Sequence, residues 1–241
     1  MDDALAIRDY LPNSFKNQND ADYIAFLWET FESNYESGKY QFAMLACHML
    51  YMSFVYFSVW QIKLSHPADF ANAVIFQQKE KELLAASSPF TFSEVQERSI
   101  FRFLRLVGCE QQHIGQFQKL VDERNEIAHS NGHIFFADQT TADRKIGEIL
   151  IQMAAIQTHM RLAIHDCLRR FLLESHNPEE REYYDDADQI QEVLIHANYF
   201  SQKDIEDCLV FDIASLSGQA EFPAIKVLFE EFRFNHSQHE D

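Results

Sequence analysis

The sequence predicts an all-α protein, and three of its features carry this prediction. The 241 residues include only 6 Gly and 5 Pro, the residues that most often mark turns. Few turns are therefore expected, as is usual when long helices dominate. Apolar residues make up 46% of the chain, with 22 Phe, which is enough for a substantial core in one or two domains. Between residues 146 and 168, apolar side chains recur with the 3.6-residue period of a helix. We therefore expect an antiparallel helical bundle.

Two long helices are expected in the first third of the chain. The first runs from near Asp20 to Ser37, where Gly38 stops it. The second continues to about Leu64, and the pair His66-Pro67 ends it because the residue before a proline disfavours helical geometry.

Residues 42–60 of the second helix are nearly all apolar and long enough to span a membrane. His48 and several Tyr and Ser side chains interrupt the run. Lys39 and Lys63 flank it symmetrically, so the charges specify no orientation in a membrane. We therefore favour a helix buried on all sides, in the core or at a dimer interface, over a membrane span.

Shorter helices are expected next. A polar helix covers residues 77–87 and ends at the run Ser-Ser-Pro, 87–89. Ser93 and Gln96 have the spacing of a capping box, which predicts the start of another helix. Its apolar face consists of Ile100, Phe103, Leu104 and Val107, and Gly108 ends it.

The following two helices flank a short apolar loop. One helix is expected over residues 110–130, with Asn and Gly at 131–132 as its stop. Residues 133–139, HIFFADQ, are expected to form a packed loop. A long helix over residues 142–175 follows, and it carries the regular apolar stripe described above.

A change in composition suggests a domain boundary after residue 176. His-Asn-Pro at 176–178 is followed by an acidic run, so we assign 1–176 to a helical domain and 177–241 to a helical C-terminal extension with a polar tail. Ser201 and Asp204 predict a capping box in this extension, and a last helix is expected over residues 222–234.

The net charge of −18 restricts the classes of partner. It argues against a general electrostatic grip on nucleic acid, although it leaves room for a small local site. It would suit a basic protein partner. The four cysteines contain no CxxC pair, and the N-terminus lacks the pattern of a signal peptide, so we expect a cytoplasmic protein with reduced cysteines.

The segment that calls for a functional explanation is DERNEIAHSNGH, residues 122–133. On a helical wheel, Arg124 falls in the middle of an apolar stripe formed by Phe117, Leu120, Val121, Ile127 and Ala128. Asn125 and His129 form an i, i+4 pair at the edge of that stripe. An ideal helix does not place Arg124 and His129 on one face, so an unwound last turn or a second copy of the chain would have to bring them together.

Structural roles account for each of these residues separately. A buried guanidinium without a partner is costly, so Arg124 can pair with Glu123, Glu126 or an acid elsewhere. A histidine is favoured at a helix C-terminus by the helix dipole, and Asn125 suits a solvent edge. Taken together, however, Arg124, Asn125 and His129 offer a phosphate-binding cation, an orienting amide and a proton-transfer group. This combination suits cleavage of an RNA phosphodiester by its own 2′-hydroxyl.

The sequence Arg124-Asn125-x-x-x-His129 resembles the R-x4–6-H motif of the HEPN domain. That family is all-helical, and many members are metal-independent endoribonucleases of toxin–antitoxin and anti-phage systems that work as dimers. The resemblance implies that Arg124 stabilises the scissile phosphate, that His129 transfers protons and that Asn125 positions them, across a homodimer and with no cofactor. Some HEPN domains are inactive, which leaves open a binding or scaffold module with an antitoxin or basic protein as its partner.

Other candidate sites have less support. Arg169 or Arg170 with His176, and Arg233 with His239, also fit the spacing, but no small amide follows these arginines. Cys109 and His113 stand at i, i+4, yet two ligands alone do not make a metal site. The spacing of His159, His165 and Cys167 does not suit ligands on one helical face, so no metal site is expected. The chain has no glycine-rich phosphate loop and no GxSxG motif.

Overall fold

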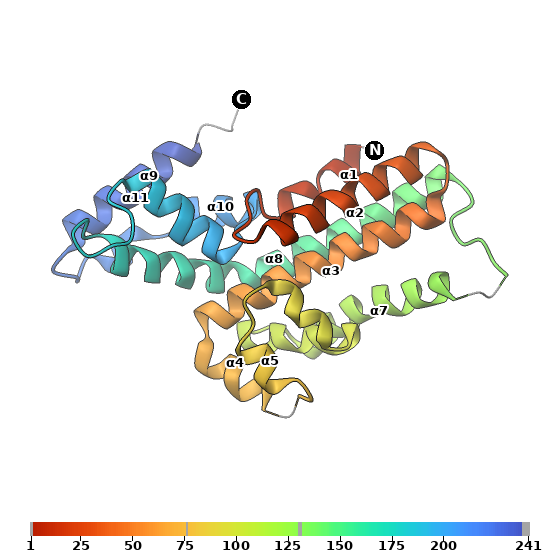
Figure 1. The fold of residues 1–241 in the computed structure, drawn as a ribbon, viewed down its shortest axis with the longest axis horizontal. Coiled ribbons are helices and arrows are strands. Elements are labelled where there is room, and N and C mark those ends of the chain that lie inside the picture. The colour runs from red at the N-terminus through yellow and green to blue at the C-terminus, as the bar shows by residue number, and fades with distance from the viewer. Residues whose placement is uncertain (1, 76, 130–131, 238–241) are drawn as a thin grey trace.

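The structure is a computed structural model that describes residues 2–75, 77–129 and 132–237, and these residues form an all-helical fold (Figure 1). The predicted fold class is therefore confirmed. Within the described ranges the only β-pairing is an isolated antiparallel bridge between Pro12 and Ser201. The α-helices are α1 (Asp2–Leu5), α2 (Gln18–Glu36), α3 (Tyr40–Ser65), α4 (Pro67–Val74), α5 (Glu80–Leu84), α6 (Glu97–Ile100), α7 (Gln111–Ala128), α8 (Gln139–Ser175), α9 (Asp186–Gln189), α10 (Gln202–Leu209) and α11 (Phe222–His236). Shorter 3₁₀ segments cover Arg8–Tyr10, Pro89–Glu94, Phe101–Val107 and Ile213–Leu216, and a π-helix covers Ile190–His196.

The long helix α3 forms the centre of the fold, with α2 and α8 packed along it (Figure 1). Among the described residues, α3 is the one helix long and apolar enough to cross a membrane, and 83% of its apolar window is buried inside the protein. The apolar side chains of α3 are therefore covered by neighbouring helices, as a helix buried on all sides requires.

The boundaries of α2 and α8 follow from local capping. The side chain of Asn17 accepts a hydrogen bond from the Asn19 amide at the start of α2, and Gly38 follows the last turn with φ +70°. At α8, the Asp138 carboxylate accepts from the Thr141 amide at 2.9 Å, so this helix begins three residues earlier than predicted. Its predicted apolar stripe is buried except for Leu150, which is half-buried.

The region between α3 and α7 departs from the prediction. Ser93 and Gln96 do not form a capping box, because Ser88 instead caps a 3₁₀ segment at Pro89–Glu94. The following segment, Phe101–Val107, is also 3₁₀ rather than α-helical. The apolar face of the predicted helix is nevertheless buried, through Phe103 and Leu104 of this segment and through Ile100 at the end of α6, so packing rather than helix type explains the apolar pattern. A short helix, α4, which begins with a proline in its first turn, was not predicted.

The segment that contains Arg124 and Asn125 is α7, which contacts α3 and is followed by α8 (Figure 1). It ends at Ala128, two residues earlier than predicted. The predicted stop at 131–132 falls partly outside the described residues, but Gly132 has the expected left-handed φ of +78°. The loop after it buries Phe136 and exposes Ile134.

The C-terminal extension packs on α3 and α8. The predicted capping box of Ser201 and Asp204 is confirmed. The indole of Trp60 on α3 donates to the Ala197 carbonyl at 3.0 Å, and Gln61 donates to Asp204 at 2.8 Å. The division at residue 176 stays a prediction from the sequence.

Candidate functional site

Arg124 lies in the apolar stripe of α7, as the helical wheel predicts, and it has a carboxylate partner there. Phe117, Leu120 and Val121 on the same helix are buried, whereas Ile127 is half-buried and Ala128 is exposed. The Arg124 side chain is 26% exposed, and its Nη2 donates to Oε2 of Glu97 on α6. The expected ion pair is therefore formed with an acid from another helix rather than with Glu123 or Glu126.

Glu97 also meets a histidine on α3. Nε2 of His48 lies 3.4 Å from the same Glu97 Oε2, and the His48 side chain is only 6% exposed. Burial lowers the pKa of His48, against the effect of Glu97. Burial raises the pKa of Glu97, but hydrogen bonds and charges from His48 and Arg124 outweigh it and hold that pKa below its ordinary value. We call Arg124, Glu97 and His48 the Glu97 network.

A second ion pair lies beside this network. Lys145 of α8 donates to Glu123, and it also donates to Glu148 at 2.8 Å. Lys145, Arg124, His48 and Phe136 line one small hollow between α3, α7 and α8. The Nε atom of Arg124 is buried there with no hydrogen-bond partner among the described residues, so the guanidinium is not fully satisfied by Glu97.

His129 is placed differently from Arg124. It is exposed at the end of α7, where its backbone N–H donates to the Asn125 carbonyl at 3.2 Å. Asn125 is half-buried, one turn before it. Within the described chain, no hydrogen bond or ion pair joins the side chains of Arg124 and His129. The structure therefore places all three motif residues in the last two turns of α7 without bringing the arginine and the histidine into contact.

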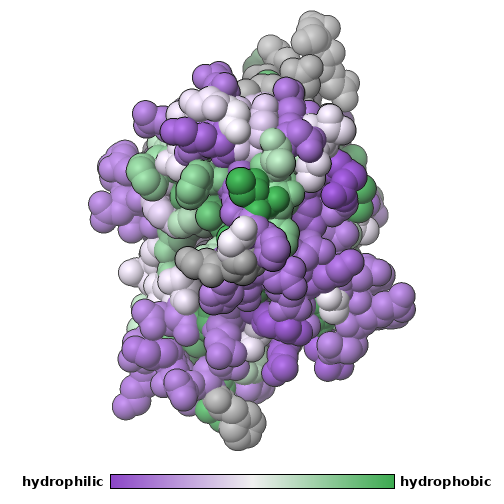
Figure 2. Space-filling model, turned by 90° about the vertical axis from the view of Figure 1, so that its right-hand side faces the viewer, coloured by the Kyte–Doolittle hydropathy of each residue, from purple (hydrophilic) through white to green (hydrophobic). Residues whose placement is uncertain are grey.

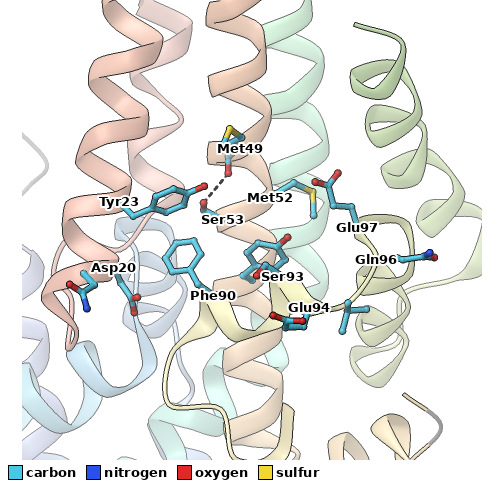
Figure 3. A pocket seen from close by; sticks show the side chains of 13 residues that line it. Asp20, Tyr23, Met49, Met52, Ser53, Phe90, Ser93, Glu94, Gln96 and Glu97 are labelled. Atoms are coloured by element: carbon cyan, nitrogen blue, oxygen red, sulfur yellow. Dashed lines mark hydrogen bonds between the residues drawn. The ribbon is translucent and has the colours of Figure 1, made fainter. Parts of the chain in front are cut away.

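A cleft on the far side of Glu97 extends the site. It has a volume of about 640 Å³ and lies between α2, α3 and the segment 90–97 (Figure 3). Tyr23, Met49 and Met52 line one part of it, and Glu94 and Glu97 line another (Figure 3). Because Glu97 is one of the residues that line the cleft, a molecule bound there could contact the carboxylate that holds Arg124.

Two groupings that sequence reasoning missed become visible only in the fold. Glu97 and His48 belong to no recognisable motif. They lie 27 and 76 positions before Arg124, so no local pattern in the sequence links them to it. Likewise, His159 lies beside Cys109 and His113 rather than with the neighbours considered above. Those neighbours have other partners, since His165 lies 2.9 Å from the Asp207 carbonyl and the Cys167 thiol points at the Gln61 carbonyl.

The chain was compared with protein-family models, curated proteins and solved structures. No family model, curated protein or solved structure matches the chain.

Proposed function

We propose that the protein is a metal-independent endoribonuclease of HEPN type, a cytoplasmic toxin or anti-phage effector built on an antiparallel helical bundle. RNA is its substrate, and two copies of the chain form the site. The observation that carries this proposal is that a half-buried arginine, anchored by Glu97, and an exposed histidine share the end of one helix.

Arg124 suits phosphate binding because Glu97 holds it in place without saturating it. A guanidinium has five N–H donors, and the Glu97 bond uses a donor on Nη2. The remaining donors can stabilise negative charge that develops on a scissile phosphate. Glu97 is thus a positioning residue in this proposal, and Arg124 is the group that touches substrate.

His129 would act as the proton-transfer group. An imidazole ring can act as a general base or a general acid, so it can accept the 2′-hydroxyl proton or donate one to the departing 5′-oxygen. The 2′-oxygen attacks the neighbouring phosphorus, the bond from phosphorus to the 5′-oxygen breaks, and the products have a 2′,3′-cyclic phosphate and a 5′-hydroxyl end. Asn125, one turn before His129, would orient the histidine or the substrate.

In a dimer, Arg124 of one copy of the chain would lie close to His129 of the other copy. Figure 2 shows the end of the molecule where α2 leads into α3 and α7 leads towards α8, and apolar side chains gather in the upper half of this face. Phe42 is 61% exposed and Ile134 is 74% exposed. The Phe135 amide donates to Gln41 at 2.9 Å, which holds the loop against the start of α3. An apolar patch next to the motif is suited to pairing with a second subunit.

The test is an RNA cleavage assay with defined product ends. Purified protein is incubated with mixed RNA in EDTA, and its fold under these conditions is checked by circular dichroism. We expect 2′,3′-cyclic phosphate ends from the unmutated protein and a loss of cleavage of at least about 100-fold in Arg124→Ala and His129→Ala. His176→Ala is the matched control, since it removes a histidine directly after α8 that also fits the R-x4–6-H spacing, six positions after Arg170. Cleavage unaffected by both motif substitutions would contradict the site.

The bond between Arg124 and Glu97 also supports a second function, a non-catalytic HEPN-like module. In this case the network is structural, and the acidic surface binds an antitoxin or another basic protein. It predicts that no RNA is cleaved and that the purified protein binds a basic partner in a salt-dependent way. Cleavage that depends on His129 would exclude this alternative.

A further inference from the structure

A cluster of three metal-binding side chains lies at the other end of α7 from the HEPN-like motif. Cys109 precedes the helix, His113 lies in its first turns, and His159 lies in the middle of α8. Their ligand atoms all lie within 4.8 Å of one another. Nε2 of His159 is 3.3 Å from Nδ1 of His113, and the ring centroids are 5.3 Å apart.

The backbone explains why Cys109 joins this cluster. Gly108 adopts a left-handed φ of +79° and ends the preceding 3₁₀ segment. The amide of Cys109 then donates to the Leu104 carbonyl at 3.1 Å, which fixes the start of the turn into α7. The Cys109 residue is 3% exposed, whereas the two histidines are half-buried. The cluster therefore has a buried thiol on one side and access from solvent on the other.

We propose that Cys109, His113 and His159 bind a zinc-type transition metal ion. Two nitrogens held at about 2.0–2.1 Å from one tetrahedral zinc ion lie roughly 3.3–3.4 Å apart, which agrees with the separation of the two histidine nitrogens. A thiolate and two imidazoles are soft and borderline donors that favour zinc over magnesium or calcium. Three protein ligands leave a fourth position for water or another ligand.

The ion would fasten α7 to α8. His113 and His159 are 46 residues apart in sequence, so a shared ion closes a long loop that contains the Arg124 segment. The metal therefore stabilises the helix that presents the motif, at the end opposite to His129. This site stands independently of the nuclease proposal, because its ligands include none of the motif residues.

The competing explanation is a hydrogen bond between the two imidazoles beside a buried thiol, which a distance of 3.3 Å also allows. Metal binding separates the two explanations. Tag-free, full-length protein is loaded with zinc, dialysed and analysed by elemental mass spectrometry, and apoprotein is titrated with cobalt. We expect about one ion per chain and a tetrahedral cobalt spectrum with a thiolate charge-transfer band.

The variants test the ligands one by one. Cys109→Ser should abolish the charge-transfer band, and His159→Ala should lower affinity by at least about 100-fold. His165→Ala, on the same helix but outside the cluster, should bind like the unmutated protein. Zinc should raise the melting temperature of the apoprotein by on the order of 5 °C in unmutated protein and His165→Ala, and not in Cys109→Ser. Absence of tight zinc binding, or binding that survives both ligand substitutions in folded variants, overturns the site.

RNA cleavage is read separately in the same samples. Cleavage by Cys109→Ser with loss of zinc would show that the two sites are distinct. Loss of cleavage in His129→Ala with zinc still bound would also show that the zinc site and the cleavage site are distinct.

Discussion

Glu97 and Asp204 are both carboxylates that contact α3, but they differ in exposure and in the kind of partner. Asp204 is 4% exposed and accepts hydrogen bonds from Gln61, Gln157 and the Ser201 amide at 2.8 to 2.9 Å. The Glu97 side chain is 31% exposed and is shared between a guanidinium and a histidine.

This difference separates a structural contact from a candidate functional one. The partners of Asp204 are neutral and enclosed, so the carboxylate ties α3, α8 and α10 together with no access for a ligand. Glu97 lines a cleft, and its bond to Arg124 leaves that guanidinium with one unpaired buried nitrogen. Partly satisfied, charged and accessible groups are typical of sites that bind or react.

The largest loss of stability is expected at the enclosed carboxylate. Asp204→Ala leaves buried donors on Gln61 and Ser201 without an acceptor and leaves Gln157 with Asp207 alone, so the free energy of unfolding should fall by about 3–5 kcal/mol. Urea unfolding followed by circular dichroism measures it. Glu206→Ala, at an exposed position on the same helix, is the control and should change stability by less than about 0.5 kcal/mol. A small effect of Asp204→Ala would remove the contrast between the two carboxylates.

A smaller loss is expected in the Glu97 network. In a double-mutant cycle, Arg124→Ala and Glu97→Ala should show a coupling energy of about 1–2 kcal/mol, since the pair is neither fully buried nor fully exposed. Urea unfolding of the two single variants and the double variant gives this value. A coupling near zero would mean that Glu97 does not hold Arg124 in solution.

The two carboxylates should respond to pH with opposite signs. The pKa of Glu97 is lowered from 4.5, so its stabilising contribution is present above that value and is lost as the pH falls through the lowered pKa. Burial raises the pKa of Asp204 from 3.8 despite its hydrogen bonds, so the pH-dependent part of its contribution is present below that value and is lost as the pH rises through the raised pKa, while the hydrogen-bond part remains.

Unfolding measured from about pH 7 to about pH 3 tests this opposition. On acidification, the destabilisation caused by Glu97→Gln should shrink, whereas that caused by Asp204→Ala should grow. Parallel pH profiles for the two variants would show that both carboxylates lie in similar environments.

The smallest loss of stability is expected at His129. Because its side chain is exposed at the end of α7, His129→Ala should change the free energy of unfolding by less than about 0.5 kcal/mol. Cleavage of RNA should nevertheless be lost. A stability loss above about 1 kcal/mol would indicate a structural role for this histidine, and the cleavage assay would then need a folded His129→Gln variant.

Features encoded within a few residues were predicted well. The ends of α2 and α3, the apolar stripe of α8 and the capping box at Ser201 were all recognisable. Each depends on side-chain periodicity or on hydrogen bonds between residues a few positions apart, and these are local properties of the chain. The segment from Pro89 to Val107 was less predictable, because a short helix can be α or 3₁₀ with the same apolar residues buried.

The sequence by itself determined the all-helical class, the long central helices and the position of Arg124 on an apolar face. Only the tertiary structure decided which acid meets Arg124, that His48 shares this acid and that His159 joins Cys109 and His113. The physical reason is that a helix pattern states which side of a segment is buried but not which segment covers it. Contacts between residues far apart in the chain depend on how the helices pack, and no local pattern encodes that choice.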